Sequence, residues 1–150
     1  MESREGIQQV LRELLSNQRL AVLSTHNSGQ PYASLVAFAC SDDLRFLYFV
    51  TPRATRKFSN LHNDGRVALL ITSSANQETD FHQAMAVTIV GSAGEISGPE
   101  KETALNRYLE RHPYLEEFAR SPTCALVKVS ARTYILVNNF QHVMEFHLEP

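Results

Sequence analysis

The chain has 150 residues, of which 43% are hydrophobic and 20% are charged, and its formal net charge at pH 7 is −2. A chain of this length and balance folds as a soluble domain without a disulfide or metal staple. The slight acidic excess argues against general nucleic-acid binding, which needs a broad basic face, and the apolar runs fall short of the roughly 20 residues of a membrane span. We therefore expect one domain over residues 1–150.

The two cysteines and the first residues indicate the cellular compartment. Cys40 and Cys124 each lie inside an apolar run, which favours buried, reduced thiols and a cytoplasmic protein, although a disulfide between them remains an alternative. Met1 precedes a charged, amphipathic segment that is unlike a secretory signal. We expect a cytoplasmic protein.

Periodicity predicts a helix followed by strands. Apolar residues between Ile7 and Leu15 recur at helical spacing, and Ser3 can cap this helix. Three apolar segments, residues 20–25, 31–40 and 44–50, are then joined by short polar turns and read as antiparallel strands. A fourth strand is predicted over residues 67–71. The first turn contains Gly29, which suits a positive φ. This half of the chain therefore predicts an antiparallel sheet.

A second, short helix is predicted between the third and fourth of these strands. Residues 52–63 place Phe58 and Leu61 on one face. We expect Gly65 to end this helix in the left-handed conformation.

The second half of the chain adds two long segments and more helix. Residues 72–82 form a polar loop, and residues 84–96 a long strand in which Gly91 and Gly94 are typical of bends or bulges. Pro99 opens a helical insertion over about 99–119, and two further strands are predicted over residues 124–137 and 143–147. Together these elements predict a mainly β fold, a closed or nearly closed antiparallel barrel with flanking helices.

A basic turn stands where the third strand gives way to the second helix. Residues 51–57 read Thr-Pro-Arg-Ala-Thr-Arg-Lys. A helix N-terminus carries unpaired N–H groups and a partial positive charge, so cations there are unfavourable unless an anion lies among them. A bound phosphate, such as that of a nucleotide-like cofactor, accounts for the pattern, and a solvated basic turn is the alternative.

The ordered set of segments resembles the FMN-binding split-barrel family, which includes pyridoxamine 5′-phosphate oxidase-like proteins. The segments that carry the resemblance are residues 20–25, 29–36, 47–51, 55–57, 60–61, 76–80 and 86–88, with Gly91. The resemblance covers residues 18–96 best. It implies a six-stranded antiparallel split barrel, a homodimer and two FMN sites at the dimer interface.

The resemblance also implies which residues contact the cofactor. Arg56 and Lys57 would bind the FMN phosphate, and Thr55 would donate its hydroxyl to it. Arg53 is either a third phosphate ligand or a surface residue, and we favour the surface position. Five more candidates lie on two strands. Ser34, Leu35 and Val36 match the strand that lines the flavin in the family, and Val50 and Thr51 end the neighbouring strand beside the phosphate site. The loop would reach the partner subunit's flavin through four polar residues: Asn76, Gln77, Asp80 and His82.

These residues favour an FMN-dependent oxidoreductase that acts on an unidentified small molecule, without an assigned catalytic residue. The C-terminal part lacks the Arg-x-His motif of the vitamin B6 oxidases, so that activity is not expected. The six histidines do not show metal-ligand spacing, and we expect no metal. Two alternatives remain: a non-catalytic flavin- or haem-binding split barrel for storage, sensing or haem degradation, and a cofactor-free dimeric structural protein.

Overall fold

The computed structural model describes residues 3–139 and 142–149. The strands are β1 (Leu20–Asn27), β2 (Gln30–Ala37), β3 (Ala39–Cys40), β4 (Phe46–Pro52), β5 (Arg66–Thr72), β6 (Ala86–Glu95), β7 (Cys124–Asn138) and β8 (His142–His147). The helices are α1 (Arg4–Asn17), α2 (Arg56–Asn63), α3 (Asp80–Gln83), α4 (Pro99–Arg111), η1 (Pro113–Leu115) and α5 (Glu116–Ala119). The mainly β class and the helical insertion are therefore confirmed.

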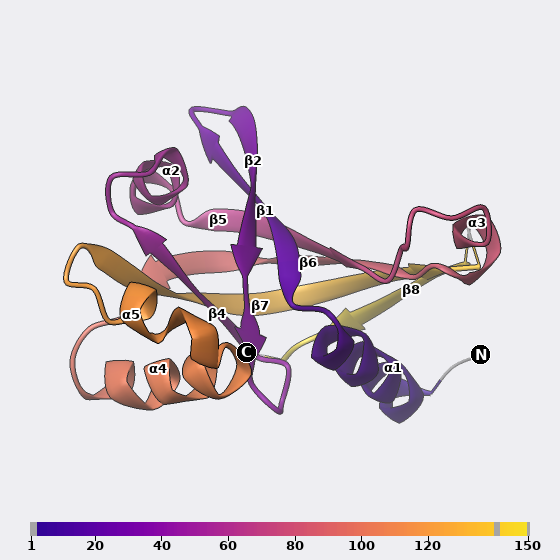
Figure 1. The fold of residues 1–150 in the computed structure, drawn as a ribbon. Coiled ribbons are helices and arrows are strands. Elements are labelled where there is room, and N and C mark those ends of the chain that lie inside the picture. Colours follow the sequence, from indigo (N-terminus) through magenta and orange to yellow (C-terminus); the bar gives the residue numbers. More distant parts are fainter. Residues whose placement is uncertain (1–2, 140–141, 150) are drawn as a thin grey trace.

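The strands form one antiparallel, curled sheet in the order β2-β1-β5-β6-β7-β4-β3, with β8 paired to β7 (Figure 1). The predicted strand over 31–40 is two pieces: β2 pairs with β1, and β3 pairs with β4. Both ends of the strand order therefore belong to one continuous segment, which bends at Phe38. This bend closes one half of the sheet into a barrel and leaves the other half split, as the resemblance implies.

The bend at Phe38 is fixed from two sides. Its backbone N–H donates to the carbonyl of Arg19, 3.3 Å away. The Nε2–H of buried His112, just after α4, donates to the Phe38 carbonyl over 2.6 Å, and the hydroxyl of Tyr108 donates to the neighbouring carbonyl of Ala37. Burial lowers the pKa of His112 below its usual range, so the imidazole is neutral in the fold.

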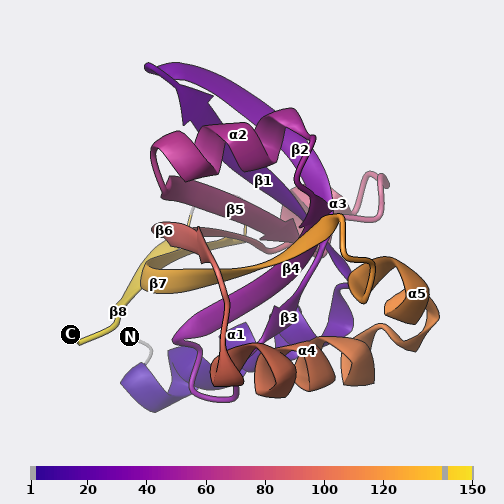
Figure 2. The same cartoon turned by 90° about the vertical axis from the view of Figure 1, so that its left-hand side faces the viewer.

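Two hydrophobic clusters hold the helices against the sheet. The first fills the barrel and receives Leu11, Leu14 and Leu15 from α1. The second lies between the sheet and α4, and there Leu105 and Tyr108 pack against β4 and β7. Figures 1 and 2 show the result, with α2 at one end of the barrel and α1 and α4 at the other.

Three local expectations hold. Ser3 caps α1, because its side chain accepts from the backbone N–H of Gly6. Gly29 has a φ of +90° in the turn between β1 and β2. The register of β6 against β7 shifts between Val90 and Gly91, which is the predicted bulge.

Two local expectations are wrong. The helix predicted over 52–63 begins only at Arg56, because Pro52 still pairs with β7 and the next N–H, that of Arg53, donates to the carbonyl of Thr123. Gly65 is not in the left-handed conformation. It is a place of close approach instead, since an added Cβ would lie 2.6 Å from the carbonyl oxygen of Ala93 on β6.

Candidate functional site

The start of α2 is built around two threonine hydroxyls. Thr55 is the N-cap, and its Oγ1 accepts from the backbone N–H of Phe58 while donating to the carbonyl of Pro52. The hydroxyl of buried Thr51 lies 2.9 Å from that of Thr55. These hydroxyls therefore fix the first turn of α2 and the end of β4, and Thr55 has no second hydrogen to donate to a ligand.

Arg56 and Lys57 occupy the first two positions of α2. Neither side chain has an ion pair or a hydrogen bond to any residue that the structure describes. The guanidinium carbon of Arg56 lies 5.3 Å from the centre of the Tyr32 ring on β2, a cation–π contact. Two positive charges thus remain uncompensated at the positive end of a helix, where an anion is favoured.

Arg53, by contrast, is neutralised. Its guanidinium forms an ion pair with Glu95, with 2.5 Å between Nη2 and Oε2, and also donates to the carbonyl of Pro122. Arg53 therefore faces β6 and the turn before β7, which agrees with the surface position that we favoured.

A cleft of about 570 Å³ opens beside Arg56. It lies between the first two turns of α2 and the hairpin of β1 and β2, and its lining residues are Asn27, Gln30, Pro31, Tyr32, Ala54, Thr55, Arg56, Ser59 and Asn60. Within the described parts of the chain this lining contains a cation but no carboxylate. It therefore suits an anionic ligand.

Residues 34–36 of β2 continue from the cleft along the strand. Ser34 and Val36 face the barrel, as their partners Leu23 and Ala21 do, whereas Leu35 points outward and is 60% exposed. The hydroxyl oxygen of Ser34 is buried and has no hydrogen-bond partner among the described residues. A buried polar atom without a partner is costly, so this hydroxyl is suited to a ligand that would complete its hydrogen bond.

Val50 differs from its neighbours in the direction of its side chain. It belongs to the cluster between β4 and α4, and it pairs with Leu126 on β7. Its side chain therefore packs in a core rather than in the cleft, so only the backbone of Val50 is available to a cofactor.

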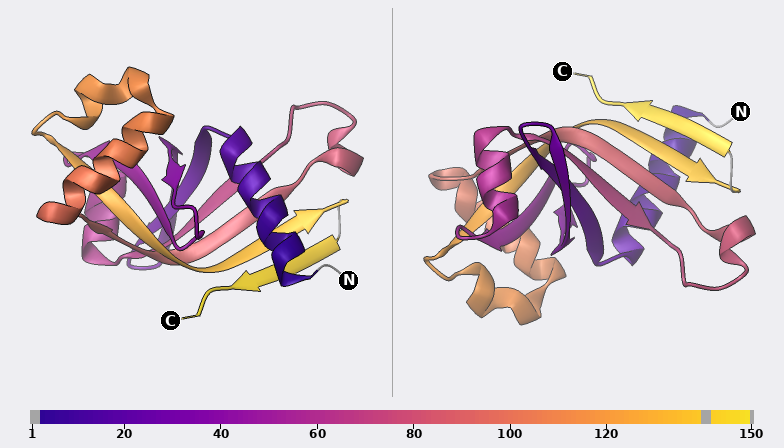
Figure 3. Two further views of the ribbon diagram at one scale, coloured as in Figure 1. Left: turned by 90° about the horizontal axis from the view of Figure 1, so that it is seen from below. Right: turned by 90° about the horizontal axis from the view of Figure 1, so that it is seen from above.

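The loop that carries the remaining candidates lies at the opposite end of the sheet from α2 (Figures 1 and 3). Asn76, Gln77 and His82 are exposed there. Asp80 is used within the loop, where its carboxylate accepts from the backbone N–H groups of Ala75 and Gln77, and these bonds lower its pKa. One chain therefore does not bring this group together with Arg56 and Lys57.

The outer face of the sheet carries a row of apolar side chains. Val22 on β1 pairs with Leu35 on β2 and with Leu70 on β5, so the three side chains lie side by side. They are 37%, 60% and 41% exposed, and Leu20 nearby is 51% exposed. An antiparallel sheet usually presents polar residues to water, so these four exposed side chains form an unusual surface, which we name the apolar face.

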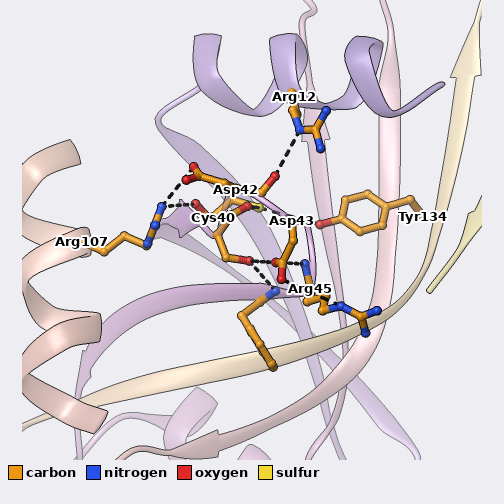
Figure 4. Close-up of polar contacts among 9 residues, drawn as sticks. Arg12, Cys40, Asp42, Asp43, Arg45, Arg107 and Tyr134 are labelled. Atoms are coloured by element: carbon orange, nitrogen blue, oxygen red, sulfur yellow. Dashed lines mark hydrogen bonds and ion pairs between the residues drawn. The ribbon is translucent and has the colours of Figure 1, made fainter. Parts of the chain in front are cut away.

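A second cleft, of about 660 Å³, is lined by residues of α1, of α4 and of the turn that follows β3. Figure 4 shows polar contacts of residues in this region. Its arginines are tied to the protein: Arg12 donates to the carbonyl of Asp42, Arg107 to that of Cys40, and Arg111 to carbonyls at the end of α1. Its lining also balances three arginines with Glu13, Asp42 and Glu110.

The thiol that lines this second cleft is not a nucleophile. Burial raises the pKa of Cys40 to about 12, and its sulfur lies 3.8 Å from the hydroxyl of Tyr134. The second cleft is therefore neutral and unreactive, and the cleft at α2 is the better candidate for a charged cofactor. Cys40 and Cys124 are both free.

Sequence reasoning missed two residues at the site. Tyr32 stacks under Arg56, and its position two residues before Ser34 on the same strand places both on one face, which a two-residue period could have revealed. Asn60 is buried on the apolar side of α2 and donates to the hydroxyl of Thr25, which ties α2 to β1. A polar residue between Phe58 and Leu61 was the available signal.

The fold is an antiparallel split barrel, and a cleft lined by a cation lies where β4 is followed by the short helix α2. The family model described as pyridoxamine 5′-phosphate oxidase matches residues 7–138. The chain belongs to this pyridoxamine 5′-phosphate oxidase-like split-barrel family. A search of curated proteins gave no match.

Solved structures show the same fold at low sequence identity. A haem-binding protein from Mycobacterium smegmatis has a TM-score of 0.84 at 15% identity, over 98% of this chain and 59% of that one. The General Stress Protein 26 of Bacillus anthracis has a TM-score of 0.73 at 19% identity, over 95% and 98%. The haem storage protein HutZ of Vibrio cholerae has a TM-score of 0.72 at 13% identity, over 83% and 89%. This chain thus spans about three-fifths of the first relative's length.

The described residues contain no helix that is both long and apolar enough to traverse a bilayer. They also contain no cluster of three or more histidine, cysteine, aspartate or glutamate side chains placed to hold a metal ion.

Proposed function

We propose that this protein binds FMN at the start of α2 and acts, as a homodimer, as an oxidoreductase on a small organic molecule. The observation that carries the proposal is the pair Arg56 and Lys57, which has no acidic partner among the described residues and lies beside a cleft without a carboxylate. An FMN phosphate carries about two negative charges near pH 7, which matches this pair.

The chain's own groups fit the phosphate. The guanidinium of Arg56 presents several N–H donors in one plane and can engage two phosphate oxygens at once, whereas Lys57 contributes a compact charge. The first N–H groups of α2 point in the same direction. Thr55 holds this turn in place by capping it, so in this proposal it positions the site rather than donating to the phosphate.

Residues 34–36 suit the ring of the flavin. β2 is at the end of the strand order, so every second backbone group on it lacks a strand partner. Such groups can donate to the polar edge of the ring, and the hydroxyl of Ser34 is a further unsatisfied group on the same segment. FMN, when bound, would supply hydride or electron transfer, and the protein would bind and orient it.

The apolar face supports the homodimer. Four large side chains are exposed together on the outer face of β1, β2 and β5, which is the kind of surface that a second copy covers. The exposed loop residues Asn76, Gln77 and His82 lie far from their own α2, so in this proposal they serve the flavin of the partner subunit.

Haem is the second candidate, because two relatives of the same fold are named for haem binding or storage. Haem iron needs an axial side chain such as histidine, cysteine, methionine or tyrosine. In the described lining of the cleft only Tyr32 is of this kind, and its ring already lies under Arg56. The lining therefore favours FMN.

The test is a titration of the purified, cofactor-free protein with FMN and, separately, with haemin, followed by visible absorbance. Saturable binding of FMN with a shifted flavin spectrum is the expected result. A Soret band with haemin and no response to FMN would support the haem alternative, and a protein that ignores both ligands would leave only a structural role.

A further inference from the structure

The cleft at α2 runs away from the part of the site that would hold the flavin ring. Along β2, the ring candidates are residues 34–36, whereas the cleft is lined by residues 30–32, which are nearer the turn with β1. Along α2, the phosphate candidates are the first two residues, whereas Ser59 and Asn60 line the cleft one turn later. Along β2 the cleft therefore extends towards the turn with β1 and away from residues 34–36, and along α2 it extends one turn past the phosphate candidates.

The cleft is also larger than a phosphate requires. Its volume of about 570 Å³ is in the range of roughly 300–1,000 Å³ that holds a whole small molecule. Beyond Arg56 its walls are neutral and able to form hydrogen bonds, since they carry the amides of Asn27 and Gln30 and the hydroxyl of Ser59. Groups of this kind bind the edge of a nucleobase and the hydroxyls of a ribose.

The charges are compatible with such an extension. The pyrophosphate of a dinucleotide carries two negative charges, and the start of α2 carries two cations, of which Arg56 lines the cleft and Lys57 is the next residue. The lining holds no carboxylate in the part of the chain that the structure describes, so a second phosphate would meet no like charge there. The exposed guanidinium of Arg56, held from one side by Tyr32, leaves its other side open to either phosphate.

From this geometry we propose that the cleft accepts the adenosine phosphate half of FAD, so that the site takes a flavin dinucleotide as well as FMN. The proposal rests on the proposed function, because it needs the flavin phosphate at the start of α2. Asn27, Gln30 and Ser59 would then contact the nucleoside, and Arg56 would contact the pyrophosphate.

The experiment compares FMN and FAD on the cofactor-free protein by flavin fluorescence. We expect the parent protein to bind FAD with a Kd within about tenfold of that for FMN. The variant Ser59→Trp fills the far part of the cleft, and it should weaken FAD by about tenfold or more while FMN stays within about twofold. The control Asn63→Trp places the same ring at the exposed end of α2, outside the lining, and should leave both flavins unchanged.

The outcomes separate the two claims. A parent protein that binds FMN but binds FAD more than about tenfold more weakly overturns the dinucleotide proposal and leaves the proposed function standing. Equal weakening of both flavins by Ser59→Trp also overturns it, because Ser59 would then not lie beyond the phosphate. Failure of the parent to bind either flavin instead removes the proposed function itself.

Discussion

Replacing Arg56 and Lys57 together with alanine tests the phosphate site most directly. Both side chains are at least partly exposed, so each contact is worth less than the roughly 1.5–3 kcal/mol of a sheltered charged hydrogen bond. We take about 1–1.5 kcal/mol for each residue, or about 2–3 kcal/mol in total. This corresponds to a rise in the Kd for FMN of about 30- to 160-fold.

The assay includes riboflavin, which has the same ring but no phosphate. The double variant should bind riboflavin as the parent does, because the lost contacts involve only the phosphate. Arg53→Ala is the matched control: its guanidinium is paired with Glu95 and lies outside the cleft, so FMN binding should not change.

Two results would refute this reasoning. An unchanged affinity for FMN in the double variant would show that the phosphate lies elsewhere. A parallel loss of FMN and riboflavin would show that the substitutions damage the fold rather than the phosphate contact, and the melting temperature of each variant would reveal that damage independently.

Three further outcomes are expected. Tyr32→Leu should weaken FMN severalfold, in line with about 0.5–1 kcal/mol for an exposed cation–π contact, while Tyr32→Phe keeps the parent affinity in the same titration. Burial lowers the folded-state pKa of His112, so the unfolded chain takes up a proton first as the pH falls through about 6.5. In denaturant titrations, the free energy of unfolding should therefore fall below that pH by at most about 1.4 kcal/mol per pH unit and level off below the folded-state pKa. The variant His112→Gln should lack this part of the pH dependence. Leu70→Glu, on the apolar face, should give monomers in sedimentation velocity, whereas Tyr114→Glu, at a residue that is 98% exposed elsewhere, should not; a parent that is itself monomeric would refute the dimer.

The spacing of apolar residues was enough to predict most helices and strands, because each of these elements buries one face. It placed α1 with its cap, most strands and the helical insertion close to their observed bounds. It gave one strand over 31–40 where β2 and β3 are separate, and a loop over 72–82 where α3 begins at Asp80. It failed at the start of α2, where strand pairing with β7 continues through Pro52 and overrides the local helix signal. The prediction for Gly65 was also wrong, because glycine is needed there for the close approach of Ala93 on β6, a residue that is distant in the sequence.

The site was predictable only in part, for the same reason. A run of cations is visible in the sequence, but which of them is already neutralised is not. Arg53 forms an ion pair with Glu95, which is 42 residues away in the sequence. Because this pair neutralises Arg53, Arg56 and Lys57 are the remaining candidates for the phosphate. The cleft itself arises where the β1–β2 hairpin approaches α2, so no local pattern could give its length or its neutral far wall.

The bend at Phe38 links residues 34–36 of β2 to the helical insertion that contains α4. The segment that would face the flavin ends only two residues before this bend, and the bend is held by Tyr108 and His112 from the helical insertion. Sequence changes that shift α4 would therefore move the backbone just after residues 34–36, which the proposed function assigns to the flavin ring. If the proposed function holds, substitutions in α4 would alter how the cofactor is held from a helix that does not line the cleft at α2.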